Sequence, residues 1–278
     1  MTDHTDQRPA LPTRRAFTTA GLLALAGCGG GGSGNGSDET GADPGGLRSL
    51  NIASRSTATT YPLSIYVPPA GSARAQDLPV VYALDGETWF QTLVGLMQTA
   101  PVPAIVVAVH TAGQRTRDFV PVNACTAGGG GEGRFLDFLR QELQPYVAAN
   151  VGGSPARQVL FGHSHGGSFV LHALFAEPPG AHGFQAYLAS DASIGCMAST
   201  VYGWEQAYAA AHATLPVRLH LSHASAGNHQ ANLDFAAALK RRAYGGLVLA
   251  DQAYAGTHLG IVPQALADGI GFALATAR

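Results

Sequence analysis

A serine between two glycines is the part of this sequence best suited to covalent chemistry. Residues 162–166 read Gly-His-Ser-His-Gly and directly follow the apolar run 159–161. Where such a run leads from a buried strand into a helix, the serine occupies a strained turn and its hydroxyl projects above the sheet. Glycine at 162 and 166 lets neighbouring backbone pass close to that turn. The pattern therefore favours Ser164 as a nucleophile over a glycine-rich turn without a chemical role.

A serine nucleophile needs a base, and histidine is the usual one. The chain contains 11 histidines. When the serine lies in a strand-to-helix turn of this kind, the base follows the last strand, and His258 holds that position. His220, His223 and His229 cluster near another strand end, but residues at odd spacing in a strand face opposite sides, so His220 and His223 diverge. No carboxylate or cysteine beside them completes a ligand set, so we expect no metal site and no cofactor.

The elements that would position these residues alternate along the chain. Short β-branched runs predict strands, and longer segments with apolar residues three or four apart predict helices. This alternation indicates an α/β fold with a mainly parallel central sheet, helices on both faces, and a single domain over residues 47–278. The predicted strands lie near 61–67, 79–84, 104–110, 157–161, 184–190, 216–223 and 246–254, and the predicted helices near 88–99, 132–148, 165–176, 202–212, 230–243 and 262–276.

Composition excludes several classes of protein. The chain has 278 residues, of which 46% are hydrophobic and 12% charged, and its formal net charge is −2. A disordered chain needs fewer apolar residues and more net charge, and a nucleic-acid-binding surface needs an excess of basic residues. We therefore expect a core-forming domain that does not bind nucleic acid.

The N-terminal segment has the features of an export signal. Arg14 and Arg15 resemble a twin-arginine motif, the short apolar stretch 20–26 follows, and Leu-Ala-Gly-Cys at 25–28 resembles the lipobox of bacterial lipoproteins. Residues 1–27 are thus expected to be a signal peptide and 28–46 a Gly/Ser-rich tether. A lipid on Cys28 would anchor an exported lipoprotein to a membrane, facing the periplasm or the extracellular side.

Four further segments carry a resemblance to a known family. Residues 78–86 end in Leu-Asp-Gly after an apolar run, residues 115–121 read Arg-Thr-Arg-Asp-Phe-Val-Pro, residues 131–146 form a helix pattern, and residues 258–266 read His-x-x-x-x-Pro-x-x-Leu. As a set, and together with the serine motif, they resemble the esterase branch of the α/β-hydrolase superfamily. That branch includes S-formylglutathione hydrolases, feruloyl esterases and the enterobactin and salmochelin esterases.

The resemblance implies a serine carboxylic-ester hydrolase with an acyl-enzyme on Ser164 and His258 as base. The backbone N–H groups of His165 and Glu87 would hold the oxyanion. Arg115 and Arg117 would bind an anionic small-molecule ester, with siderophore trilactones as candidates, although local pairing of Arg117 with an acidic neighbour is an equal alternative. An acyltransferase and a non-catalytic binding module on the same fold remain as other functions.

The acid that would orient His258 stays open at this stage. Relatives often carry it on the loop after the seventh strand, but residues 222–230 contain no carboxylate. Asp191 follows the sixth strand and is one candidate, and Asp234 in the next helix is another. The third alternative is a Ser–His dyad without an acid.

Two cysteines follow strands that end at the same edge of the predicted sheet. Cys125 and Cys196 would both lie at the rim that carries Ser164 and His258. Export to an oxidising compartment would allow them to form a disulfide. Two separately buried thiols are the alternative, because free cysteine is often buried.

Overall fold

The computed structural model describes residues 46–275, except for 70–73 and 123. The expected signal peptide (1–27), Cys28 and nearly all of the expected tether (28–46) lie outside the described residues. Gly46, the last residue of the expected tether, is the first residue of a strand. Among the described residues, no helix is both long and apolar enough to cross a bilayer.

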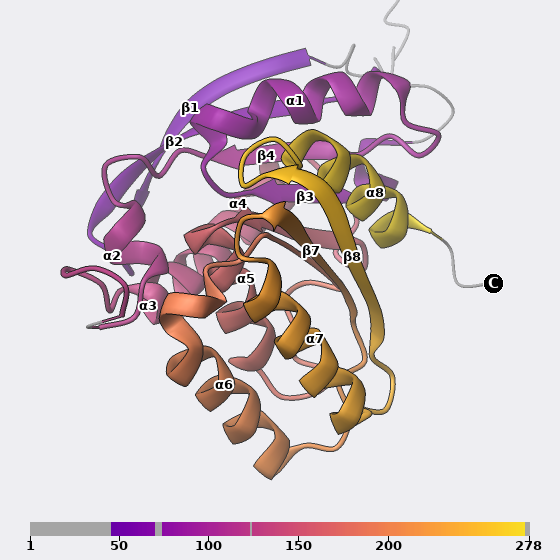
Figure 1. Cartoon of the computed structure of the whole chain (residues 1–278). Helices are drawn as coiled ribbons and strands as arrows, with labels where there is room; N and C mark the ends of the chain where they lie inside the picture. The colour runs from indigo at the N-terminus through magenta and orange to yellow at the C-terminus, as the bar shows by residue number, and fades with distance from the viewer. Residues whose placement is uncertain (1–45, 70–73, 123, 276–278) are drawn as a thin grey trace, which may run out of the picture. The chain divides into compact units, whose positions relative to one another are not determined.

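One sheet forms the centre of the described chain, with eight strands in the order β1-β2-β4-β3-β5-β6-β7-β8 (Figure 1). The strands β3 to β8 run parallel to one another, whereas β2 is antiparallel to both β1 and β4. Every residue of the central strands β3 to β6 is buried, as expected for parallel strands covered on both faces. The strands are β1 (Gly46–Ser54), β2 (Thr59–Val67), β3 (Val80–Ala83), β4 (Ile105–Val109), β5 (Gln158–His163), β6 (Ala186–Ser190), β7 (Arg218–Ala226) and β8 (Val248–Thr257).

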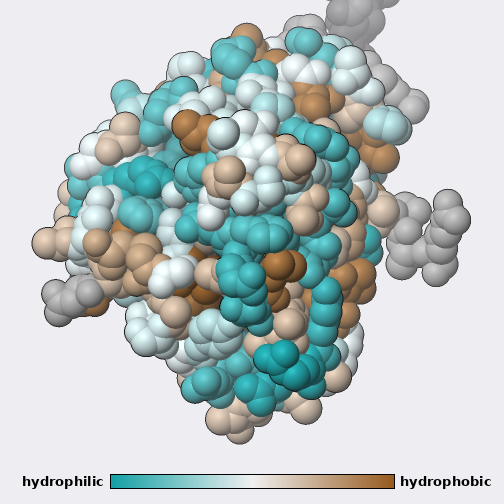
Figure 2. Space-filling view, in the orientation of Figure 1, coloured by the Kyte–Doolittle hydropathy of each residue, from teal (hydrophilic) through white to brown (hydrophobic). Residues whose placement is uncertain are grey.

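Helices cover both faces of this sheet and bury a separate core on each. Apolar residues of α1 and α8 pack on one face, while those of α3, η2, α5, α6 and α7 pack on the other (Figure 1). The helical elements are η1 (Ala75–Asp77), α1 (Gly86–Thr99), α2 (Arg115–Phe119), α3 (Glu132–Asp137), the π-helical η2 (Phe138–Leu143), α4 (Gln144–Asn150), α5 (His165–Phe175), α6 (Ile194–Ala211), α7 (His229–Arg242) and α8 (Val262–Leu274). A groove of about 360 Å³ lies between the C-terminal ends of α1 and α8, and apolar side chains gather on that side in the space-filling view (Figure 2).

The predicted fold class is confirmed, and each predicted strand and helix has a counterpart in the structure. Some elements were mispredicted or not predicted, among them the three-residue η1. The edge strand β1 was missed because its residues alternate between half-buried and exposed and include no continuous apolar run. The five-residue α2 lies where the sequence predicts a loop. The helix α6 begins at Ile194 and not near 202, since a kink at Met197 joins its first turn to the rest.

Candidate active site

The turn between β5 and α5 places Ser164 at the carboxyl edge of the sheet. Ser164 has φ 60° and ψ −120°, a conformation that L-residues rarely adopt. A Cβ at residue 162 would collide with the carbonyl group of Gly166, and one at residue 167 would lie 3.0 Å from the carbonyl oxygen of Ser190. Position 166 has ordinary space, with its nearest atom 3.5 Å away. The close approaches are therefore at 162 and 167, which corrects the expectation for Gly166.

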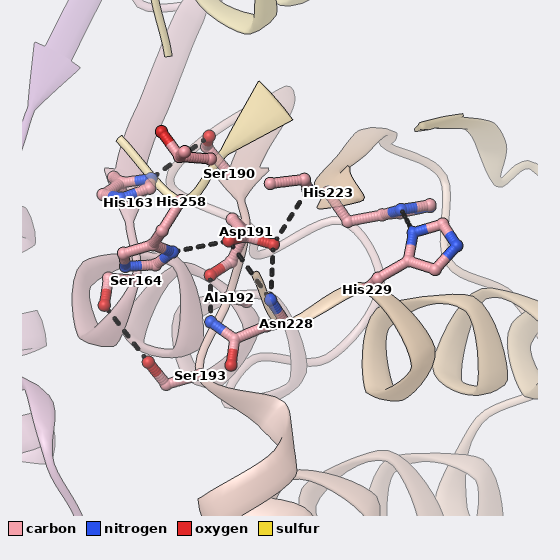
Figure 3. Close-up of polar contacts among 12 residues, drawn as sticks. His163, Ser164, Ser190, Asp191, Ala192, Ser193, His223, Asn228, His229 and His258 are labelled. Carbon is pink, nitrogen blue, oxygen red and sulfur yellow. Dashed lines mark hydrogen bonds and ion pairs between the residues drawn. The ribbon is translucent and has the colours of Figure 1, made fainter. Parts of the chain in front are cut away.

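The loop after β8 carries His258 to the same edge, where it meets Asp191 at the end of β6. His258 Nδ1 lies 2.5 Å from Asp191 Oδ2 (Figure 3). Asp191 is fully buried, whereas about a third of the His258 side chain is exposed. In this arrangement the carboxylate fixes the ring orientation and leaves Nε2 as the nitrogen that can accept a proton.

Asp191 is held by the loop in which relatives often carry the acid. The backbone N–H groups of Ala224 and Asn228 donate to its carboxylate at 3.0 and 3.1 Å. Asn228 also donates from Nδ2 to the Asp191 carbonyl oxygen at 2.9 Å. Asp191 itself has φ 40°, and Gly227 leaves space beside Oδ2 that a side chain would occupy. The loop thus supplies donors in place of a carboxylate.

Asp234, the second candidate acid, lies elsewhere. It is an exposed residue of α7, and its carboxylate accepts a hydrogen bond from Gln230 at 2.8 Å. Of the three alternatives left open by the sequence, the geometry therefore fits Asp191.

The hydroxyl of Ser164 makes its hydrogen bond with Ser193 Oγ, at 3.2 Å. Ser193 precedes α6, and its backbone N–H donates to the Ser164 carbonyl oxygen at 3.1 Å. Figure 3 shows the ring of His258 between Asp191 and Ser164, and the side chains of Ser164 and His258 line the same cavity. No sequence motif predicts that Ser193 forms hydrogen bonds with Ser164.

Backbone donors are available on two sides of the serine. His165 is the first residue of α5, and Gly86 and Glu87 are the first two residues of α1. Among the described residues, no backbone carbonyl accepts a hydrogen bond from the N–H groups of these three residues. Helix N-termini leave such groups free and attract negative charge. The Glu87 carboxylate accepts a hydrogen bond from the Thr111 N–H at 3.1 Å.

His163, the residue before the serine, packs against His258. The two ring centroids are 4.3 Å apart, and the rings of Trp89 and His163 are also in contact, nearly perpendicular to each other, with centroids 5.5 Å apart. His163 Nδ1 lies 3.3 Å from Ser190 Oγ, and Nε2 is buried without a partner. Burial lowers the pKa of His163 to about 4, and the neighbouring His258 contributes in the same direction. The ring is therefore neutral at neutral pH.

Arg115 joins the two sides of the site. Its Nε donates to both carboxylate oxygens of Asp85, at 2.9 and 3.0 Å, and Nη2 donates to the His163 carbonyl oxygen at 3.1 Å. Burial raises the pKa of Asp85, while the Arg115 charge opposes that rise. The remaining nitrogen, Nη1, has no partner among the described residues, and Arg115 lines the cavity over Ser164.

The side chain of Arg117 connects neighbouring elements of the fold and does not take the substrate-binding position that the family resemblance implies. Its guanidinium donates to Asp118 at 2.7 Å, to Thr59 Oγ1 at 2.8 Å and to the Tyr61 hydroxyl at 2.8 Å. All three nitrogens are therefore engaged, and Arg117 does not line the cavity. The local pairing that the sequence left as an alternative explains this residue.

A cavity of about 460 Å³ opens over the serine. The lining residues come from the start of α1, the start of α2 and the segment before it, the end of β5 with the turn that follows, and the loop after β8. They are Asp85, Glu87, Thr88, Trp89, Ala112, Arg115, His163, Ser164, His258 and Leu259. The lining combines polar side chains with apolar ones such as Trp89 and Leu259, as is typical of binding sites for small molecules.

Cys125 and Cys196 form a disulfide at the same edge, with their Cα atoms 5.1 Å apart. Cys196 lies in the first turn of α6, three residues after Ser193. The bridge joins the segment after α2 to the helix that follows the acid.

The cluster of His220 and His223 on β7 and His229 at the start of α7 agrees only in part with the prediction. His220 and His223 do diverge, since His220 packs on Phe272 of α8 while His223 faces His229. A carboxylate is nevertheless present, because Asp251 lies 3.1 Å from His223 Nε2. The two hydrogen bonds occupy both ring nitrogens of His223.

A Ser–His–Asp arrangement at the carboxyl edge of a mainly parallel sheet, with the serine in a strand-to-helix turn, defines the α/β-hydrolase fold. The chain belongs to the family described as "Putative esterase", whose model matches residues 54–217.

Curated relatives and solved structures agree with that assignment. A siderophore triacetylfusarinine C esterase of Aspergillus fumigatus is 35% identical over 133 residues, or 42% of this chain and 44% of that protein. The ferri-bacillibactin esterase BesA of Bacillus subtilis is 31% identical over 174 residues, or 51% and 57% of the two chains. The matches thus span about half the length of these relatives. An IroE-like serine hydrolase of Shewanella oneidensis is 28% identical, with a TM-score of 0.71 over 81% of this chain and 79% of that one.

Proposed function

We propose that this protein is a serine carboxylic-ester hydrolase that forms an acyl-enzyme on Ser164. The observation that carries the proposal is the 2.5 Å contact between the buried Asp191 carboxylate and His258, which lines the same cavity as Ser164. Membership of the esterase family supports the same reaction class.

In the proposed reaction, Ser164 Oγ attacks the ester carbonyl carbon while His258 Nε2 takes its proton. The charge that develops on the carbonyl oxygen is held by the N–H groups of His165 and Glu87, and each such donor typically contributes about 3 kcal/mol to the transition state. His258 then gives its proton to the leaving alcohol. A water molecule, deprotonated by His258, releases the acid and restores the serine.

Esters of siderophores are the proposed substrate class. The two curated relatives described above carry that activity in their names. The free Nη1 of Arg115 offers a cationic donor at the cavity for a catecholate or carboxylate oxygen. The acidic side chains of Asp85 and Glu87 are already engaged by Arg115 and by the Thr111 N–H, which reduces repulsion of an anionic ligand.

Substitution of the nucleophile tests the reaction. We expect Ser164→Ala to hydrolyse neither p-nitrophenyl butyrate nor a tricatecholate trilactone and to lose labelling by a fluorophosphonate. The control Ser225→Ala, at the exposed C-terminal end of β7, should behave as wild type. Retention of more than a few per cent of activity in pure Ser164→Ala would overturn the assignment. An alcohol that diverts the acyl group from water would identify an acyltransferase instead.

We also propose that a lipid on Cys28 attaches the protein to a membrane. The proposal rests on the sequence in which the twin arginine, the apolar stretch and the Leu-Ala-Gly-Cys motif follow one another in residues 14–28. We expect labelled palmitate to enter the wild-type protein and Cys28→Ser to leave the membrane fraction. Wild-type protein that takes up no label would contradict this proposal.

A further inference from the structure

The disulfide lies against the side chain of His165, the residue that follows the proposed nucleophile. The two sulfur atoms and one ring nitrogen of His165 all lie within 4.8 Å of one another. Both cysteines are exposed, so a reductant in solution can reach the bond. This set of two sulfurs and an imidazole is the only group of three or more candidate metal ligands that the described residues bring together.

We propose that reduction of the Cys125–Cys196 disulfide creates a binding site for a thiophilic divalent cation such as Zn²⁺, with Cys125, Cys196 and His165 as its ligands. A dithiol reductant supplies two electrons and two protons: its own disulfide forms while the protein disulfide becomes two thiols. Binding of Zn²⁺ then releases both thiol protons to solvent, because the thiolate is the metal ligand.

The required movement is small. Zn²⁺ binds sulfur at about 2.3 Å and imidazole nitrogen at about 2.0–2.1 Å, so its ligand atoms are about 3.3–3.8 Å apart in a tetrahedral site. The three atoms here already lie within 4.8 Å, and the Cα atoms of the two cysteines are 5.1 Å apart. Once the sulfur–sulfur bond is broken, rotation of the two cysteine side chains separates the thiolates to that range. Two cysteines, one histidine and an open fourth position form a known type of zinc site.

The imidazole of His165 is available for this role. No hydrogen bond from the described residues reaches its ring, and the ring is half-buried.

The site is continuous with the nucleophile. Cys196 Sγ lies 3.6 Å from the Ser193 carbonyl oxygen, and Ser193 Oγ lies 3.2 Å from Ser164 Oγ. A cation bound to the His165 ring would place a positive charge and its water beside the proposed oxyanion donor. We therefore expect bound Zn²⁺ to change the rate of the ester hydrolysis proposed above, and this consequence rests on that proposed function, whereas the binding itself does not.

The test measures binding directly. Full-length protein carrying Cys28→Ser is prepared in the oxidised form and, after dithiothreitol treatment and anaerobic gel filtration, in the reduced form. Competition with a chromogenic chelator then gives the number of Zn²⁺ ions bound per chain, and Co²⁺ reports thiolate ligands by its charge-transfer absorption. We expect one Zn²⁺ per chain in reduced protein beyond any bound by the oxidised form.

Variants assign the ligands and control for unfolding. The double variant Cys125→Ser/Cys196→Ser retains every histidine and should bind no more Zn²⁺ than oxidised protein. His165→Ala, in the reduced form, should weaken binding at least tenfold, a loss that an unfolded chain with two free thiols would not show. Equal binding by oxidised and reduced protein, or undiminished affinity in reduced His165→Ala, would overturn the proposal. The rate of p-nitrophenyl butyrate hydrolysis by reduced protein should change when Zn²⁺ is added and return to its starting value with EDTA.

Discussion

At the scale of single residues, the site is defined by how Asp191 is held. A buried carboxylate is stable in its charged form only when hydrogen bonds replace the lost water. Two backbone N–H groups and the His258 ring do so here. The two backbone donors hold the carboxylate in place beside His258.

Asp191→Asn should lower kcat for ester hydrolysis at least about a hundredfold, because an amide neither stabilises the imidazolium nor holds the ring in the required tautomer. Asp234→Asn, which changes an exposed carboxylate of α7, should leave kcat within about twofold of wild type. Stopped-flow or steady-state assays of purified variants decide this. A near-wild-type kcat for Asp191→Asn would favour the Ser–His dyad.

We expect His163 to affect catalysis through the packing of its ring against His258 and not through its charge. Its pKa of about 4 keeps it neutral, and its ring packs 4.3 Å from His258. We expect His163→Phe to keep kcat within about fivefold of wild type and His163→Ala to lose about tenfold or more, with KM little changed, since the alanine leaves His258 unsupported. Equal losses in both variants would contradict a packing role.

At the scale of elements, the strand-to-helix turn and the loop after β6 are built against each other. Ser164 donates its backbone N–H to the Ser190 carbonyl oxygen at 2.9 Å, and Ser193 donates back to the Ser164 carbonyl oxygen at 3.1 Å. Gly167 allows α5 to approach the same loop. The strained conformation of Ser164 therefore persists because neighbouring elements hold it from both sides.

Gly162→Ala should destabilise the protein by several kcal/mol or prevent folding, because its Cβ meets backbone that cannot move aside. Gly95→Ala is the matched control: it lies inside α1 with open space at the Cβ position, so we expect about 0.5–1 kcal/mol of added stability. Urea unfolding of both variants measures the difference. A Gly162→Ala protein as stable as wild type would refute the steric argument.

At the scale of the whole molecule, buried imidazoles make stability depend on pH. Burial lowers the pKa of both His163 and His172 to about 4, and both ring nitrogens of His172 are buried without partners. In the unfolded chain each histidine titrates near pH 6.5. The unfolded state therefore binds more protons as the pH falls below about 6.5, and stability is lost down to about pH 4.

Between pH 6.5 and 4.5 each such histidine should lower the free energy of unfolding by up to about 1.4 kcal/mol per pH unit. His172→Phe keeps a ring against Trp204 and removes one of these contributions. We expect its urea-unfolding free energy to fall less steeply with pH than that of wild type, while the value at pH 8 measures any change in packing. Parallel pH dependences would contradict the assignment to His172.

The sequence by itself determined the alternating elements, the serine turn and the histidine after the last strand, because these depend on local pattern and chain order. It could not select Asp191 as the acid, because that choice depends on which backbone N–H groups lie beside the end of β6. The two donors, Ala224 and Asn228, are 33 and 37 residues away from Asp191 in the chain. Nor could it separate Arg115 from Arg117, two residues apart on one short helix, whose side chains reach Asp85 and Asp118 respectively. The Cys125–Cys196 bridge, across 71 residues, and its contact with His165 likewise arise only where parallel strands bring distant loops to one edge of the sheet.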